Sequence, residues 1–172
     1  MHLPLRELLA VDERGALQFF FAGLKDVSAP HVDQQELLYN ASVLAHYSQV
    51  SSFSDTDFPA PQTLSMVFDN FVMDTGSPLD VTMMETAGSH CLLMTGFFGD
   101  QMRCRHSLRW YSDLGAGFFF RASALESEKR KAALLLAISE HFDAWRHRYA
   151  RLSRELRDLP YLLKVPNTSR TE

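Results

Sequence analysis

Apolar residues recur along this chain at intervals of three and four positions, the spacing that gathers side chains on one face of an α-helix. Two of these stripes are long: one comprises Cys104, Leu108, Tyr111, Gly115, Phe118, Ala122 and Leu125, and the other Leu135, Ile138, Phe142, Trp145, Tyr149, Leu152 and Leu156. Such regular alternation is typical of helices that pack at shallow crossing angles. We therefore predict two long C-terminal helices, over residues 100–125 and 128–158, packed as a hairpin.

Shorter helical segments are predicted upstream of this hairpin. Asp33 followed by Glu36 resembles a capping box, which predicts a helix from there to about residue 51. Its expected buried face comprises Leu37, Ala41, Leu44 and Ser48. Three further segments follow the same logic: a helix after Asp12 carrying Leu17, Phe20, Phe21 and Leu24, a short helix starting at Pro61, and a helix that starts at Ser77-Pro78 and ends before Gly99.

The pattern predicts an all-α protein. The stretch with the most strand-like content, residues 92–98, contains Leu92, Leu93 and Met94 and is flanked by helix-capping residues, which favours a helix. We expect a single-domain bundle of about six helices over residues 1–166, because 172 residues are enough to bury a core. Residues 167–172 are expected to form a flexible C-terminal tail after Pro160 ends the last helix.

The net charge and the hydropathy of the chain argue against nucleic acid as a partner and against a membrane span. The formal net charge is −4 and the pI about 6.0, so no overall positive field attracts nucleic acid. No apolar run approaches the ~20 residues that cross a bilayer, and the first residues do not resemble a secretion signal. We expect a cytoplasmic protein that binds no nucleic acid and does not span a membrane. Cys91 and Cys104 are expected to be reduced thiols in apolar stripes.

Motifs for catalysis or metal binding are weak. Asp74-Thr75-Gly76 resembles the signature of aspartic proteases, but a second copy and a β-rich scaffold are missing. Histidines occur without the Glu-x-x-His or His-Glu-x-x-His spacing of helical metal sites, so we expect no metal and no cofactor. Glu140, Asp143 and His147 share a helix face beside the apolar stripe, which favours a solvated side-chain cluster.

His90 is the histidine with the most informative surroundings, because it lies in a segment expected to be buried. A buried imidazole needs partners for both ring nitrogens. We interpret it as a core or interface residue; the alternative is a contact to a haem, a metal or another ligand, with His46 as its companion.

A basic cluster at residues 103–109 is the second candidate for ligand binding. Arg103, His106 and Arg109 are expected in the first turns of a helix, where positive charge opposes the macrodipole. Compensation is expected from a nearby carboxylate, with Asp69, Asp74, Glu85 and Asp100 as candidates. The alternative is an anionic ligand held at the helix start.

One run of phenylalanines and one glycine complete the residues singled out from the sequence. Phe118-Phe119-Phe120 cannot all face one interface, because successive helical residues turn by about 100°. Phe118 is the candidate to line an apolar cavity. Gly115 is expected where another helix comes close, at a contact that leucine would overfill and alanine would still fit.

Two functions from different classes follow. The first is a non-enzymatic interaction or assembly protein that forms a homo-oligomer, expected to be a dimer, because the apolar surplus exceeds what one stripe per helix requires. The alternative is a bundle that binds an apolar or aromatic ligand, or haem, in a phenylalanine-lined cavity with His90 or His46 as the polar group. No catalytic pattern favours an enzyme, although active sites assembled from distant helices leave no spacing signal.

Overall fold

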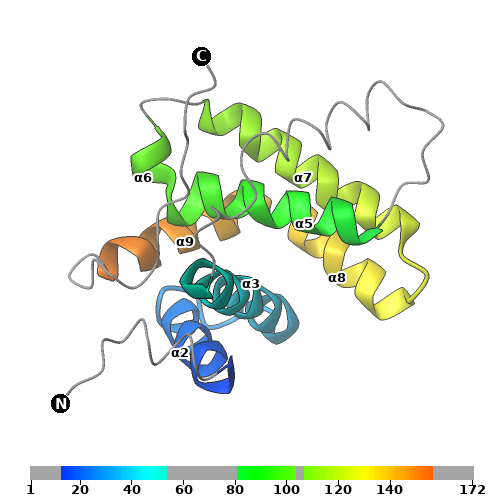
Figure 1. Ribbon diagram of the computed structural model, residues 1–172. Coiled ribbons are helices and arrows are strands. Elements are labelled where there is room, and N and C mark those ends of the chain that lie inside the picture. Colours follow the sequence, from blue (N-terminus) through cyan, green and yellow to red (C-terminus); the bar gives the residue numbers. More distant parts are fainter. Residues whose placement is uncertain (1–12, 54–80, 104–106, 157–172) are drawn as a thin grey trace. The chain divides into compact units, whose positions relative to one another are not determined.

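The computed structural model describes residues 13–53, 81–103 and 107–156, and these residues form helices joined by short turns (Figure 1). The helices are α2 (Glu13–Asp26), α3 (Gln34–Phe53), α5 (Val81–Leu92), the π-helix η1 (Leu93–Phe97), α6 (Gly99–Met102), α7 (Leu108–Leu125), α8 (Lys129–Glu140) and α9 (Phe142–Glu155). The described ranges contain no strand, and the all-α prediction is confirmed. The helix predicted from Pro61, the helix start at Ser77-Pro78 and the tail at 167–172 lie outside these ranges.

The chain divides into two compact units, the first of which comprises residues 1–61 and 152–172. Within it α2 packs against α3, and Phe20, Leu24, Leu37 and Leu44 are almost completely buried. Helix α3 begins where the capping box predicts, because Oδ1 of Asp33 accepts hydrogen bonds from the backbone N–H groups of residues 35 and 36, at 2.9 and 3.1 Å. The predicted buried stripe of this helix is confirmed.

The second unit comprises residues 62–151 and is built around α7. Helix α5 runs along one side of α7, and α8 folds back beside α7 to form the C-terminal hairpin (Figure 1). Most of the predicted apolar stripe of this hairpin is buried: Leu135, Ile138, Phe142, Trp145 and Tyr149 expose 2% or less of their surface. Leu125, the last residue of the stripe predicted on the preceding helix, is instead 42% exposed. None of the described helices is long and apolar enough to cross a membrane.

The last long helix is interrupted at His141, where a single continuous helix was predicted. His141 has φ −98° and ψ 16°, away from helical values, and α9 begins at the next residue. Backbone hydrogen bonds continue across the bend: the His141 N–H donates to the carbonyl of Ala137, and the Trp145 N–H donates to the carbonyl of His141. The apolar stripe therefore continues through the bend, which explains why its spacing did not reveal the interruption.

The helix predicted to start at Asp100 is also divided, which corrects its boundary. A four-residue helix, α6, ends at Met102, and α7 starts at Leu108 after Ser107. The hydroxyl of Ser107 accepts a hydrogen bond from the Trp110 N–H at 3.3 Å, the arrangement of an N-cap. Cys104, the first member of the predicted stripe, lies outside the described residues.

A π-helix carries the chain from α5 to α6. The Phe98 N–H donates to the carbonyl of Leu93, five residues back, at 2.9 Å. Gly96, inside this π-helix, lies against α9: a Cβ there would come within 2.7 Å of Cβ of Tyr149 and 2.9 Å of the Arg146 carbonyl oxygen. The absence of a side chain at residue 96 thus permits direct contact between the two backbones.

Candidate functional site

The two histidines predicted as a pair lie in different units of the chain. His90 is buried on α5 with 4% exposure, whereas His46 is exposed on α3. The Nε2 atom of His90 is buried and makes no hydrogen bond with the described residues, while the residue as a whole has other interactions. The burial of His90 is confirmed, and its pairing with His46 stays a prediction.

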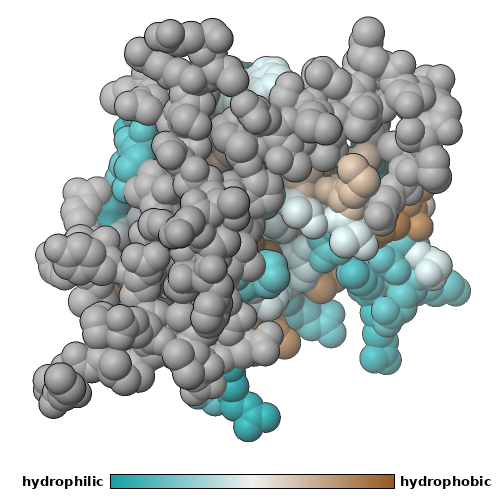
Figure 2. Space-filling view, in the orientation of Figure 1, coloured by the Kyte–Doolittle hydropathy of each residue, from teal (hydrophilic) through white to brown (hydrophobic). Residues whose placement is uncertain are grey.

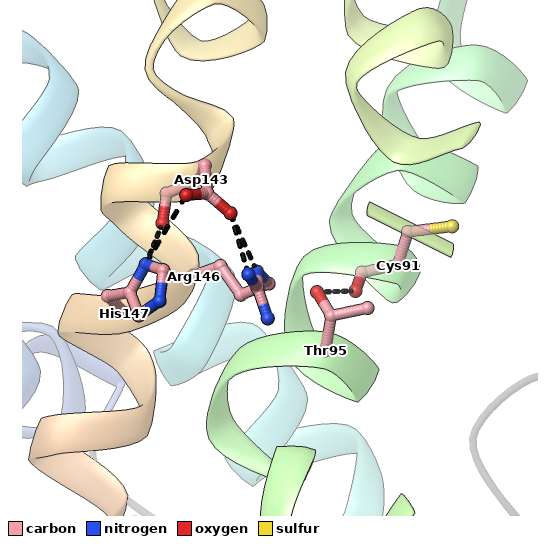
Figure 3. A network of polar contacts seen from close by, with 5 residues as sticks. All are labelled: Cys91, Thr95, Asp143, Arg146 and His147. Atoms are coloured by element: carbon pink, nitrogen blue, oxygen red, sulfur yellow. Dashed lines mark hydrogen bonds and ion pairs between the residues drawn. The ribbon is translucent and has the colours of Figure 1, made fainter. Parts of the chain in front are cut away.

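The residue after His90 is a thiol held in the interior. Cys91 is fully buried, and burial raises its pKa to about 12. Its carbonyl accepts a hydrogen bond from the Thr95 hydroxyl at 2.7 Å, which ties this turn to the π-helix (Figure 3). Burial also raises the pKa of Tyr111, and nearby Cys91 adds to that rise. The Cys91 thiol is therefore protonated at neutral pH, which suits core packing better than nucleophilic attack.

The predicted basic cluster does not share one helix. Arg103 is the C-cap of α6, Arg109 lies in the first turn of α7, and His106 lies outside the described residues. Arg103 is exposed and lies 3.8 Å from the Asp100 carboxylate, the compensation expected from the sequence. Exposed pairs of this kind contribute little to stability. Glu85, another expected partner, lies 3.2 Å from Lys131.

Arg109 borders a cleft of about 550 Å³ beside the junction of α8 and α9. The cleft is lined by Arg109, Ser112, Asp113, Ala116, Ser139, Glu140, Phe142, Asp143 and Arg146. Most of these side chains are polar or charged, and Phe142 is the aromatic residue among them. This cleft is therefore not the phenylalanine-lined cavity expected for haem or an apolar ligand. The ligand-binding function stays a prediction, and the cleft does not support it.

Two of the charged residues at the cleft, Asp143 and Arg146, form an ion pair along α9 (Figure 3). Arg146 donates two hydrogen bonds to one oxygen of Asp143, at 2.7 and 3.1 Å. These bonds lower the pKa of Asp143, partial burial opposes that change, and the charges of Arg146 and His147 lower the pKa further. The Nδ1 atom of His147 lies 2.7 Å from the carbonyl oxygen of Asp143. Glu140, Asp143 and His147 are exposed, as expected, but they do not share one helix, because Glu140 ends α8 and the other two lie on α9.

No set of three or more His, Cys, Asp or Glu residues in residues 13–53, 81–103 and 107–156 is arranged to hold a metal ion.

The phenylalanine run on α7 divides between the core and the surface. Phe118 and Phe119 are buried at 2% and 0% exposure, whereas Phe120 is 56% exposed. Phe118 thus packs in the core of the second unit. Trp110, on the same outer side of α7 as Phe120, is 49% exposed. Between them in sequence lies Gly117, where an added Cβ would meet no atom of the described part of the chain within 4 Å.

Trp110 was not identified from the sequence, although the predicted stripe through Leu108 and Tyr111 already leaves it off the buried face. It lies seven residues before Gly117, which is two helical turns, so the two positions share a face. Among the coloured residues, Figure 2 shows hydrophilic surface in teal and smaller apolar areas in brown. Single exposed apolar side chains are common on protein surfaces, so large exposed aromatic side chains are informative where they share one helix face. We define the outer α7 face as Trp110, Asp113, Leu114, Gly117, Phe120, Arg121 and Ala124.

Comparisons of the chain with protein-family models, with curated proteins and with solved structures found no match.

Proposed function

We propose that this chain is a non-enzymatic helical assembly protein that acts as a homodimer, and that the outer α7 face is the surface on which the second copy docks. The observation that carries this proposal is the pair of exposed aromatics, Trp110 and Phe120, on the side of α7 that faces away from its core. Aromatic side chains of this size supply much of the binding energy in protein interfaces.

Packing on the opposite side of α7 supports a docking role for the outer face. Ser112, Gly115, Phe118, Phe119 and Ala122 are buried, so α7 already has a complete inner face. Phe120, which is 56% exposed, therefore contributes little to the packing of the second unit. Half-exposed Trp and Phe side chains are unfavourable in water, and covering them in an interface would recover roughly 25 cal/mol for each Å² of apolar surface.

The glycine between the aromatics supports the same proposal. Gly117 is in the interior of a helix, where glycine is less favourable than alanine by about 1 kcal/mol. Among the described residues, no atom lies within 4 Å of the place that its Cβ would take. A helix of a second molecule that approaches closely at this point would account for it.

Sedimentation equilibrium of the full chain tests the proposal. We expect the mass of two copies, and we expect Phe120→Ser to raise the dissociation constant by at least about tenfold, which corresponds to the loss of one interface anchor. Leu38→Ser is the matched control, because Leu38 is 50% exposed on α3 and lies in the other unit.

Circular dichroism should show the same helicity in both variants, since neither side chain belongs to a core. A parent chain that stays monomeric at micromolar concentration, or a Phe120→Ser chain that associates as well as the parent, would refute the proposal.

A further inference from the structure

We infer that two copies of the chain pair through α7 in an antiparallel orientation, with the two-fold axis passing at Gly117. This inference rests on the proposed homodimer and specifies its geometry. It follows from the way in which exposed residues are distributed on either side of Gly117.

The outer α7 face is symmetric about Gly117 in position. A helical residue turns by about 100°, so residues three, four and seven positions away from Gly117 return to within about 60° of its direction. These positions are occupied by Leu114 and Phe120, by Asp113 and Arg121, and by Trp110 and Ala124. In an antiparallel pair with its two-fold axis at Gly117, each residue faces the other residue of its couple on the second chain. Leu114 then faces Phe120, Asp113 faces Arg121, and Trp110 faces Ala124.

The chemistry of the three couples is complementary under this symmetry. Asp113 and Arg121 are both exposed, and each would face the opposite charge on the partner, so the attraction occurs twice. Trp110, the largest side chain of the face, would lie over the small partner residue Ala124. Leu114 would pack against Phe120 of the second copy, which places apolar surface against apolar surface.

Charge decides the orientation. In a parallel two-fold pair, each residue faces its own copy, so Asp113 would face Asp113 and Arg121 would face Arg121. Like charges in direct opposition are unfavourable, and they commonly discriminate between alternative pairings of helices. The antiparallel pair also sets the two helix macrodipoles in opposite directions. At the axis Gly117 faces Gly117, and with no atom within 4 Å of a Cβ the two backbones can come close.

Charge reversal tests the pairing of Asp113 with Arg121. Asp113→Arg alone and Arg121→Asp alone each place like charges opposite one another at both ends of the interface. We expect each variant to dimerise at least about tenfold more weakly than the parent. An equimolar mixture restores both attractions, so native mass spectrometry with one chain isotopically labelled should show the mixed dimer as the main species.

The matched control for this experiment is Asp26→Arg mixed with Arg130→Asp. Both residues are exposed, and neither belongs to the outer α7 face. We expect each of these variants to dimerise like the parent and the mixture to give statistical proportions of the three dimers.

Cysteine cross-linking distinguishes the two orientations directly. In a chain with Cys104→Ser, Gly117→Cys places a thiol on the axis, next to its own copy, and a short bis-maleimide should link two chains. Ala124→Cys is the control: in the antiparallel pair its two copies lie about 21 Å apart along the helix, fourteen residues at 1.5 Å each, and should not be linked. In a parallel pair both variants would be linked.

The outcomes separate the geometry from the proposed function. A chain that does not dimerise, or whose dimer is unaffected by Phe120→Ser, overturns both. A dimer that Phe120→Ser dissociates overturns the antiparallel register alone in either of two cases: its single charge-reversed variants associate as tightly as the parent, or its Ala124→Cys chains cross-link as readily as Gly117→Cys chains.

Discussion

At the scale of single residues, Gly115 and Gly117 lie two positions apart in one helix and should respond to alanine in opposite ways. A Cβ at Gly115 would lie 2.5 Å from Cζ of Phe142 and 2.6 Å from Cβ of Cys91, and the second of these atoms cannot move without its backbone. The close approach predicted at Gly115 is confirmed, but the expectation that alanine fits there is wrong.

We expect Gly115→Ala to destabilise the fold by ~1–3 kcal/mol, because overpacking outweighs the gain in helix propensity. Gly117→Ala should stabilise it by up to ~1 kcal/mol, because the added methyl group meets nothing. Urea unfolding measures both, in a Phe120→Ser background that removes dimer formation from the comparison. Equal effects of the two substitutions would contradict the packing described around Gly115.

Asp143 provides a residue-scale prediction about pH. Its pKa lies below the usual 3.8, chiefly because Arg146 donates hydrogen bonds to the ionised carboxylate. A folded-state pKa below the unfolded value means that the ionised carboxylate adds stability above about pH 4, and that this contribution is lost as the pH falls through the folded-state pKa. Arg146→Gln should raise the pKa of Asp143 towards its usual value in an NMR titration. Arg151→Gln, on the exposed side of α9, should leave it unchanged; an equal shift in both variants would exclude the Arg146 hydrogen bonds as the cause.

At the scale of elements, the start of α7 depends on one hydroxyl group. Ser107 accepts a hydrogen bond from the Trp110 N–H and so satisfies one of the amides that a helix start leaves without a partner. Ser107→Ala should lower the free energy of unfolding by ~1 kcal/mol, and Ser107→Asp should largely retain it, because aspartate also caps. Chemical denaturation distinguishes these outcomes. If alanine and aspartate behave alike, the cap does not stabilise α7.

The α7–α8–α9 arrangement gives a second prediction at this scale. Phe142 is 2% exposed and meets Gly115 directly after the bend at His141. Phe142→Ala should destabilise the fold by ~3–5 kcal/mol, through lost burial and the cavity left behind. Leu136→Ala is the comparison, because Leu136 is 37% exposed on the neighbouring helix and its loss should cost far less. A loss below about 1 kcal/mol for Phe142→Ala would show that the bend does not hold this ring in the core.

At the scale of the whole molecule, association and folding should be linked. A dimer forms only from folded chains, so the melting temperature of the parent should rise as the protein concentration is increased. The Phe120→Ser chain should melt at a temperature that does not depend on concentration. Differential scanning calorimetry over a hundredfold concentration range measures both. A parent melting temperature that is independent of concentration would argue against a dimer that stabilises the fold.

The sequence by itself determined the helical class, the buried stripes and one helix start. The spacing of apolar residues identifies the side chains that are buried, because residues three or four positions apart lie on the same face of a helix. Leu135, Ile138 and Trp145 are examples, and all three are buried. The start of α3 was also predictable, because an Asp33 cap acts on amides two and three residues away.

Only the tertiary structure decided the breaks in the long helices and the roles of the candidate residues. The bend at His141 leaves the apolar spacing unchanged, and it needs neither proline nor glycine, so no local signal marks it. Phe118 and Phe120 have the same chemistry, and their separation into core and surface depends on which sides of α7 are covered by α5 and α8. Which sides of a helix are covered depends on contacts between residues distant in sequence. The spacing of apolar residues within one helix therefore cannot predict it.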